Sequence, residues 1–175
     1  MFGGMDERWR YVGFDMDHTF GDQHPNPVSS PTRDPYVSRL LSRPGPRRLY
    51  YRLLWELING YGSPSVSGPY FDALQQATQI LTGSIKNFLR TAAINVQKKL
   101  EPFTSARFRV TTNFGREITT DQASVELEGE APIQVAFIFY QRGDDGLLAL
   151  EPLWTGPTTW RASFDLPEAE NPFEL

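Results

Sequence analysis

The apolar residues of the region 34–100 recur every three or four positions, which is the period of an amphipathic helix. The clearest case is the segment 85–100, whose apolar positions lie 3, 4, 7, 8, 11 and 15 residues after the first. Asp34 as a cap and Pro35 in the first turn predict a short helix over 34–42, and the same period predicts longer helices over 46–59 and 69–81. Glycine and proline separate these segments, and Pro102 is expected to end the fourth helix because proline disfavours helical backbone at the residue before it.

After Pro102 the apolar residues alternate with polar ones, which is the period of a half-buried strand. Strands are predicted over 108–112 and 123–128, and a central strand over 132–141, which is apolar on both faces for most of its length. Segments 147–154 and 158–164 are expected as edge strands, because Pro152 fits an edge. Helices followed by an antiparallel sheet define an α+β fold.

Neither end of the chain shows a sustained period. Residues 1–33 contain a Pro/Ser-rich stretch and are interpreted as an extended N-terminal arm, in which WRYVGF at 9–14 is compatible with a short strand. Residues 166–175 are interpreted as an acidic C-terminal tail, which leaves a single α+β domain over 34–165. No window approaches the roughly 18 apolar residues of a membrane span, and the first ten residues lack the apolar centre of a signal peptide.

Composition narrows the function classes. The 175 residues include no cysteine, which excludes disulfides, thiolate zinc sites and cysteine nucleophiles. The two histidines, His18 and His24, are the only ones available for histidine chemistry. The 14 glycines and 14 prolines exceed the ordinary share of about one residue in eight, as expected for a chain rich in loops and arms.

The net charge of −4 conceals two opposed halves. Residues 1–110 hold 11 Arg and 3 Lys against 9 acids, a balance of +5, and residues 111–175 hold 3 Arg against 12 acids, a balance of −9. Such a chain can contact oppositely charged neighbours, including copies of itself. Arginine also suits planar pairing at interfaces. We therefore expect a protein interface, with a solvated helix face as the alternative, at the arginines Arg39, Arg43, Arg47, Arg48 and Arg52. Nucleic acid is disfavoured because the acidic segments would repel phosphates.

The string YVGFDMDHTFGD resembles the first motif of the haloacid dehalogenase-like phosphatases. The resemblance implies Asp15 as the phosphoryl-accepting nucleophile and Asp17 as the acid/base, around a magnesium ion. VTTN at 110–113 and RGDDG at 142–146 resemble later motifs of that family, but the lysine required between them is absent, since the last lysine is Lys99. A magnesium-dependent phosphatase therefore stands as an alternative.

A metal site built from Asp15, Asp17, His18 and His24 has suitable ligand types, but their spacing has no regular scaffold. No cofactor and no resident metal are expected.

A second resemblance covers the region 68–141. The long helix ends in Leu100-Glu101-Pro102, a strand of alternating residues follows from Phe108, and a later strand runs over 135–140. This succession is similar to the small baseplate wedge family of contractile phage tails, which also occurs in type VI secretion baseplates. The family motif is Glu-Pro-Arg; Glu101 and Pro102 match it, and Phe103 replaces its arginine. The candidates to supply the missing guanidinium are Arg107 and Arg109.

The wedge resemblance implies a small α+β subunit that works by docking and not by catalysis. We therefore expect a non-enzymatic structural subunit of a phage tail or baseplate, whose partners are other tail or baseplate proteins and copies of itself, with no membrane. Its expected location is the virion tail, after assembly in the host cytoplasm. A neck, connector or tail-terminator virion protein is the alternative within the same class.

Overall fold

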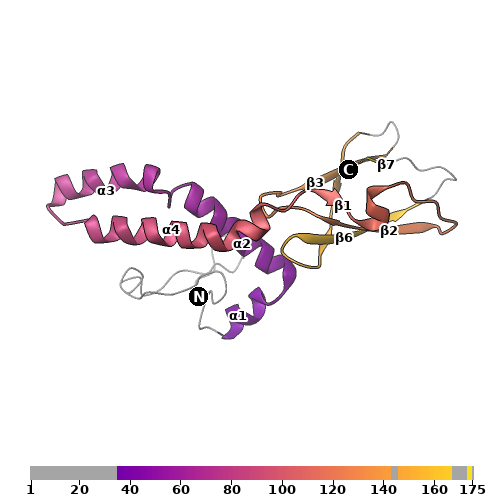
Figure 1. Ribbon diagram of the computed structural model, residues 1–175, viewed down its shortest axis with the longest axis horizontal. Coiled ribbons are helices and arrows are strands. Elements are labelled where there is room, and N and C mark those ends of the chain that lie inside the picture. Colours follow the sequence, from indigo (N-terminus) through magenta and orange to yellow (C-terminus); the bar gives the residue numbers. More distant parts are fainter. Residues whose placement is uncertain (1–34, 143–145, 167–172, 175) are drawn as a thin grey trace, which may run out of the picture.

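The computed structural model describes residues 35–142, 146–166 and 173–174. Its helices lie in one half of an elongated molecule and its strands in the other (Figure 1). The helices are α1 (Pro35–Leu41), α2 (Pro44–Asn59), α3 (Pro64–Thr78) and α4 (Gly83–Thr104). The other elements are β1 (Arg109–Val110), η1 (Thr112–Gly115), β2 (Ser124–Glu130), β3 (Ile138–Arg142), β4 (Leu148–Leu150), β5 (Leu153–Trp154), β6 (Thr159–Asp165) and β7 (Phe173–Glu174). The predicted α+β class is confirmed.

The predicted helix ends differ from the observed ones where proline is involved. α3 begins at Pro64, so Pro69, its predicted start, lies inside the helix. Pro64 is accommodated in the first turn, where a missing N–H breaks no hydrogen bond. The prediction that Pro102 ends α4 was also wrong. The helix continues to Thr104, and the Ser105 N–H still reaches the carbonyl oxygen of Glu101 at 3.0 Å.

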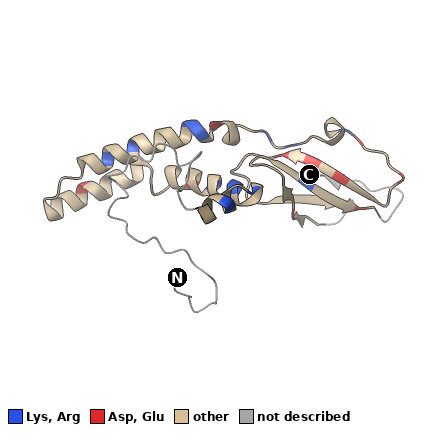
Figure 2. Ribbon diagram, turned by 90° about the horizontal axis from the view of Figure 1, so that it is seen from below, with Lys and Arg blue, Asp and Glu red and all other residues tan. Residues whose placement is uncertain are grey.

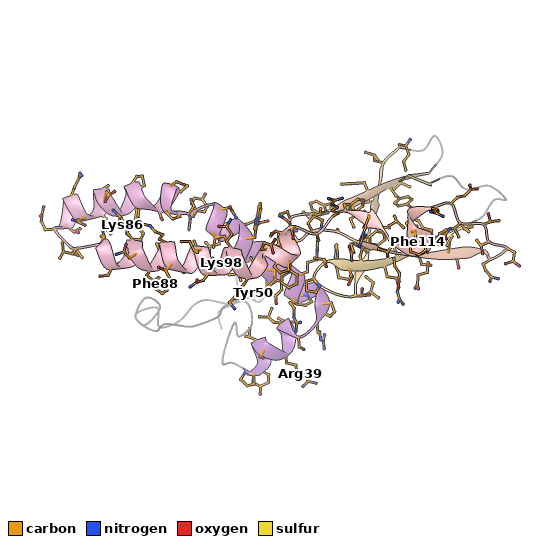
Figure 3. All side chains as sticks on the ribbon, in the orientation of Figure 1. Arg39, Tyr50, Lys86, Phe88, Lys98 and Phe114 are labelled. Carbon is orange, nitrogen blue, oxygen red and sulfur yellow. The ribbon has the colours of Figure 1, made fainter. Side chains whose placement is uncertain are left out.

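α3 and α4 form a hairpin that projects from the helical half (Figure 1). Gln79 takes a left-handed conformation (φ 60°) and ends α3, so the predicted extension to residue 81 is wrong. Thr82 is almost fully buried at the turn, and its N–H and hydroxyl both donate to Oε1 of Gln75, at 3.2 and 3.0 Å. Lys86 on α4 forms an ion pair with Asp72 on α3 (Figure 3). These polar contacts hold the two helices together at the tip.

The strands form two antiparallel sheets, in the orders β1-β2-β6-β5 and β4-β3-β7. β6 was expected at an edge, but it lies inside the first sheet because β2 pairs along its whole length and β5 covers part of its other side. β4 and β5 lie at edges as predicted, on either side of Pro152. Within the predicted acidic tail, β7 pairs with β3.

The segment 132–141 was expected to be one long central strand. Only its second half is extended, as β3, which does lie at the centre of its sheet. Its first half forms a turn in which the Val135 N–H binds the carbonyl oxygen of Pro132 at 3.1 Å. The apolar residues of this turn are explained by packing against α2 and α4, where Ile133 is fully buried.

Two apolar cores hold the molecule together. One lies in the sheet half and includes Trp160, Phe164 and Ile138. The other joins α2, α4 and the turn through Tyr51, Leu100 and Ile133. Gly129 on β2 lies so close to the indole of Trp160 that a Cβ atom there would be 2.2 Å from the ring. Only glycine therefore allows β2 and Trp160 to approach in this way.

Candidate protein interface

The five arginines predicted at an interface do not form one surface. Arg39 on α1 and Arg43 at the start of α2 are exposed (Figure 3 labels Arg39). Nε of Arg47 donates to the carbonyl oxygen of Leu41 at 2.8 Å, which ties α1 to α2. Arg52 is half-buried and pairs with Glu56 one turn along α2, at 3.3 Å. The exposed basic face is thus carried chiefly by Arg39 and Arg43.

Arg48 has a different role, because only 5% of it is exposed. Its guanidinium donates to four carbonyl oxygens: those of Ala131 and Pro157 from one terminal nitrogen, at 3.1 and 2.6 Å, and those of Pro132 and Val135 from the other, at 2.7 and 2.8 Å. Nothing in the sequence distinguishes this arginine from its neighbours. The fold uses it to join α2 to the loops of the sheet half.

The neighbours of the Arg48 guanidinium include the aromatic ring of Trp154 and the positive charge of Arg52. The guanidinium carbon of Arg48 lies 3.6 Å from the centre of the Trp154 ring, a close cation–π contact. Burial, and to a lesser extent the charge of Arg52, lower the pKa of Arg48 from its ordinary value to about 10. The carbonyl dipoles supply the electron density that a carboxylate would otherwise provide.

The two residues of the wedge-like motif lie in the last turn of α4, and both are exposed. Glu101 contributes through its backbone: its carbonyl oxygen accepts the N–H and the hydroxyl of Ser105, at 3.0 and 2.7 Å. Of the two candidates for the missing guanidinium, Arg107 is exposed, and Arg109 pairs with Glu130 across β1 and β2 at 2.9 Å. Neither is placed against Glu101 by any contact that the structure defines.

An exposed apolar stripe runs along α2. Leu49, Leu53 and Leu57 follow one another at one-turn intervals, and 48%, 51% and 53% of them are exposed. Leu54 and Ile58, which the sequence places with them, instead pack partly on the core of Tyr51. A signal for this division exists in the sequence: apolar and aromatic residues occupy more of the α2 circumference than one buried face requires.

Further large apolar side chains are exposed on both halves. The hairpin exposes Val66, Tyr70, Leu74, Ile80 and Leu81, and the sheet half exposes Phe114, Phe137, Phe139, Leu147 and Leu153. No described residue of α3 is fully buried. Contiguous exposed apolar surface on a soluble domain typically marks a protein–protein contact.

The charge asymmetry of the sequence becomes a spatial one. Residues 35–110 hold eight Arg and three Lys against three acids, and the described side chains of 111–166 hold two Arg against seven acids. Figure 2 shows the basic residues mainly on the helices and the acidic ones mainly on the strands. The long axis therefore runs from a positive half to a negative half.

Two clefts accompany these surfaces. The larger, of about 400 Å³, lies between β4 and β6 and includes Tyr140, Glu151 and Asp165 in its lining. The smaller, of about 150 Å³, lies beside the α2 stripe, between Leu49, Arg52 and Trp154. Each is open to solvent, as a docking groove is.

The catalytic alternative finds no additional support among the described residues. Asp15, Asp17, His18 and His24 lie outside them, as does most of the RGDDG turn. In the part that is described, no three His, Asp or Glu side chains gather as metal ligands would. All strand pairs there are antiparallel, whereas the phosphatase family requires a parallel sheet. None of the helices in the same part combines the length and hydrophobicity that crossing a bilayer demands.

No family model, curated protein or solved structure matches the chain. What can be concluded about function therefore rests on the residues and surfaces described above.

Proposed function

We propose that this chain is a non-enzymatic structural subunit of a large assembly, of the phage tail or baseplate class that its wedge-like segment resembles. The observation that carries the proposal is the amount of large apolar side chain left exposed on helices and strands alike. A chain that functioned alone would be expected to cover such surface.

The α2 stripe illustrates the argument best. Leu49, Leu53 and Leu57 lie on the side of α2 away from the core of Tyr51, and each is about half exposed. Burying one leucine side chain contributes roughly 1.5–3 kcal/mol. A neighbouring subunit that covered the stripe would therefore gain several kcal/mol from these three residues.

The hairpin and the charge division point the same way. α3 and the part of α4 before Val96 contribute to neither core, so this end of the hairpin (Figure 1) leaves apolar side chains exposed for a partner to contact. Opposed charges at the two ends favour contacts between the positive half of one copy and the negative half of another, and such contacts repeated head to tail produce rings or filaments.

The test is incorporation into particles by producing cells, with Leu53→Asp as the variant and Asn95→Asp as the matched control. Both residues are exposed on helices and both substitutions add one negative charge, but only the first removes apolar surface. We expect Asn95→Asp to be incorporated like the wild type, and Leu53→Asp to fold normally by circular dichroism but to be lost from particles. Equal incorporation of the two variants would contradict the role of the stripe. Magnesium-dependent hydrolysis of phosphate esters, abolished by Asp15→Asn, would contradict the non-enzymatic assignment.

A further inference from the structure

The cleft between β4 and β6 exists because one strand changes sheets. β4 pairs with β3 through Ile138↔Leu150 and its neighbours. After Pro152, β5 pairs with β6 of the other sheet, but only at Trp160 and Arg161. Since proline lacks an N–H, Pro152 suits the point where the chain leaves one ladder and joins another. Beyond Arg161, β6 and β4 diverge and leave the cleft of about 400 Å³.

Beyond Arg161, the backbone edge of β6 on the β5 side has no paired strand among the residues that the structure describes. The carbonyl oxygen of Thr159 accepts from Thr155 and Gly156, so it faces the β5 side. Backbone groups alternate between the two sides of a strand, and therefore the N–H and C=O groups of Ser163 and Asp165 face the same side, along the cleft. No strand that the structure describes pairs with them there. The opposite wall is β4, whose described pairing is with β3 alone.

The side chains of the cleft alternate as a sheet face does. Ala162 and Phe164 of β6 are buried, and Phe164 meets Tyr140 of β3 edge to face, with 5.2 Å between ring centroids. Ser163 and Asp165 point outward and are exposed, and Glu151 lies exposed beside β4. A strand added here would place apolar side chains inward and basic ones outward.

We propose that residues 8–14 of a neighbouring copy add to β6 as this missing strand. In the sequence Arg8-Trp9-Arg10-Tyr11, the aromatic and basic residues alternate with the period of a strand. Trp9 and Tyr11 match the inward positions beside Ala162 and Phe164, and Arg8 and Arg10 match the acidic outer rim. Strand addition of this kind takes affinity from the backbone ladder and specificity from alternate side chains.

The donor is a second copy because of the charge division, so the inference rests on the proposed function. A head-to-tail contact brings the positive helical half of one copy beside the negative sheet half of the next. The segment 1–34 joins the described chain at Pro35, in the helical half, and the recipient cleft is in the sheet half. The 21 residues from Phe14 to Pro35 can span up to about 70 Å when extended, which is ample reach.

The absence of cysteine makes the test specific. Full-length chains carrying Arg10→Cys are mixed with full-length chains carrying Ser163→Cys and treated with a short bis-maleimide. We expect a cross-linked dimer of the two variants. Thr91→Cys, exposed on α4, replaces Ser163→Cys in the control, which should give little cross-linking.

A chain carrying both Arg10→Cys and Ser163→Cys identifies the donor. Cross-linking only within single chains would overturn exchange between copies, and no cross-linking in any combination would overturn the assignment of residues 8–14 to the cleft. Either failure, in a chain that is still incorporated into particles, would leave the proposed function intact. The proposed function itself is tested separately, by whether Leu53→Asp is lost from particles.

Discussion

Replacing Arg48 by methionine removes the guanidinium and keeps an unbranched apolar side chain of comparable length. The guanidinium bonds to four carbonyl oxygens are lost, at Ala131, Pro132, Val135 and Pro157, and of these the Pro132 oxygen keeps the N–H of Val135 as a second donor. The stacking contact with Trp154 is lost at the same time. Because these acceptors belong to the loops of the sheet half, the substitution acts on the joint between the two halves.

The size of the change in the free energy of unfolding depends on how many of these carbonyl oxygens can form a hydrogen bond with water instead. The bond to Ala131 is buried, so its acceptor stays unsatisfied at a cost of about 1–3 kcal/mol. The other three bonds are only part-buried, and their loss costs roughly 0.5–1.5 kcal/mol each. Relief of the desolvation of a buried cation offsets several kcal/mol of this total. We expect a net loss of about 3 kcal/mol in the free energy of unfolding, which lowers Tm by roughly 6–12 °C for a chain of this size.

The assay is urea denaturation followed by tryptophan fluorescence, to which Trp154 contributes together with the core residues Trp55 and Trp160. Arg39→Met is the matched control, because Arg39 is exposed on α1, and it should change the free energy of unfolding by less than about 0.5 kcal/mol. Arg48→Lys should be destabilised as well, since an ammonium has three donors and lacks the planar fork that reaches four carbonyls. An Arg48→Met protein with the same urea midpoint as Arg39→Met would refute the reasoning.

Three further predictions concern stability. Gly129→Ala should lower the free energy of unfolding by at least about 2 kcal/mol, because the new Cβ meets the indole of Trp160 and a backbone oxygen. Gly68→Ala in α3 is the control: its new Cβ meets no atom within 4 Å, so it should raise the free energy of unfolding by roughly 0.5–1 kcal/mol. Thermal melts compare the two variants. Thr82→Val removes the hydroxyl bond to Gln75 and should lower the free energy of unfolding by about 1–2 kcal/mol. Amide hydrogen exchange should become faster in the α3–α4 hairpin but not in the sheets, and equally faster exchange in both would contradict a local role. Burial, and secondarily Tyr51, raise the pKa of Tyr50 above 10.0, so the stability linked to its neutral form is present below pH 10 and lost as the pH rises through the folded-state pKa. Tyr50→Phe should therefore flatten the fall in the free energy of unfolding above about pH 10, and Tyr61→Phe, which replaces an exposed ring, should leave it unchanged.

Periodicity was sufficient for the fold class and for the existence of the four helices, because each segment follows the helical period over enough residues. The helix boundaries assigned from proline were wrong at Pro69 and Pro102, where one missing N–H costs less than the helix around it gains. Periodicity failed at the turn before β3, where Ile133 is buried by contacts with distant helices and not by a strand ladder. Apolar residues alone do not show which partner buries them.

The candidate interface could be predicted only in outline. The charge division is visible in the sequence, and it persists in space. The separate roles of Arg48 and Arg39 were not visible, because both are arginines in a helical segment and only the tertiary fold brings four carbonyl oxygens to one of them. The cleft between β4 and β6 likewise depends on strand pairing that Pro152 suggests but does not determine.

The most direct measurement of the assembly role is the mass of the native species that contains this chain. Lysate of producing cells is separated on a density gradient, and each fraction is probed for the chain and for tail proteins. If the chain is a structural subunit, it should sediment with tail or baseplate particles at a fixed ratio to their other components. Recovery of the chain solely as a 19.9 kDa monomer, with particles complete without it, would contradict the proposal.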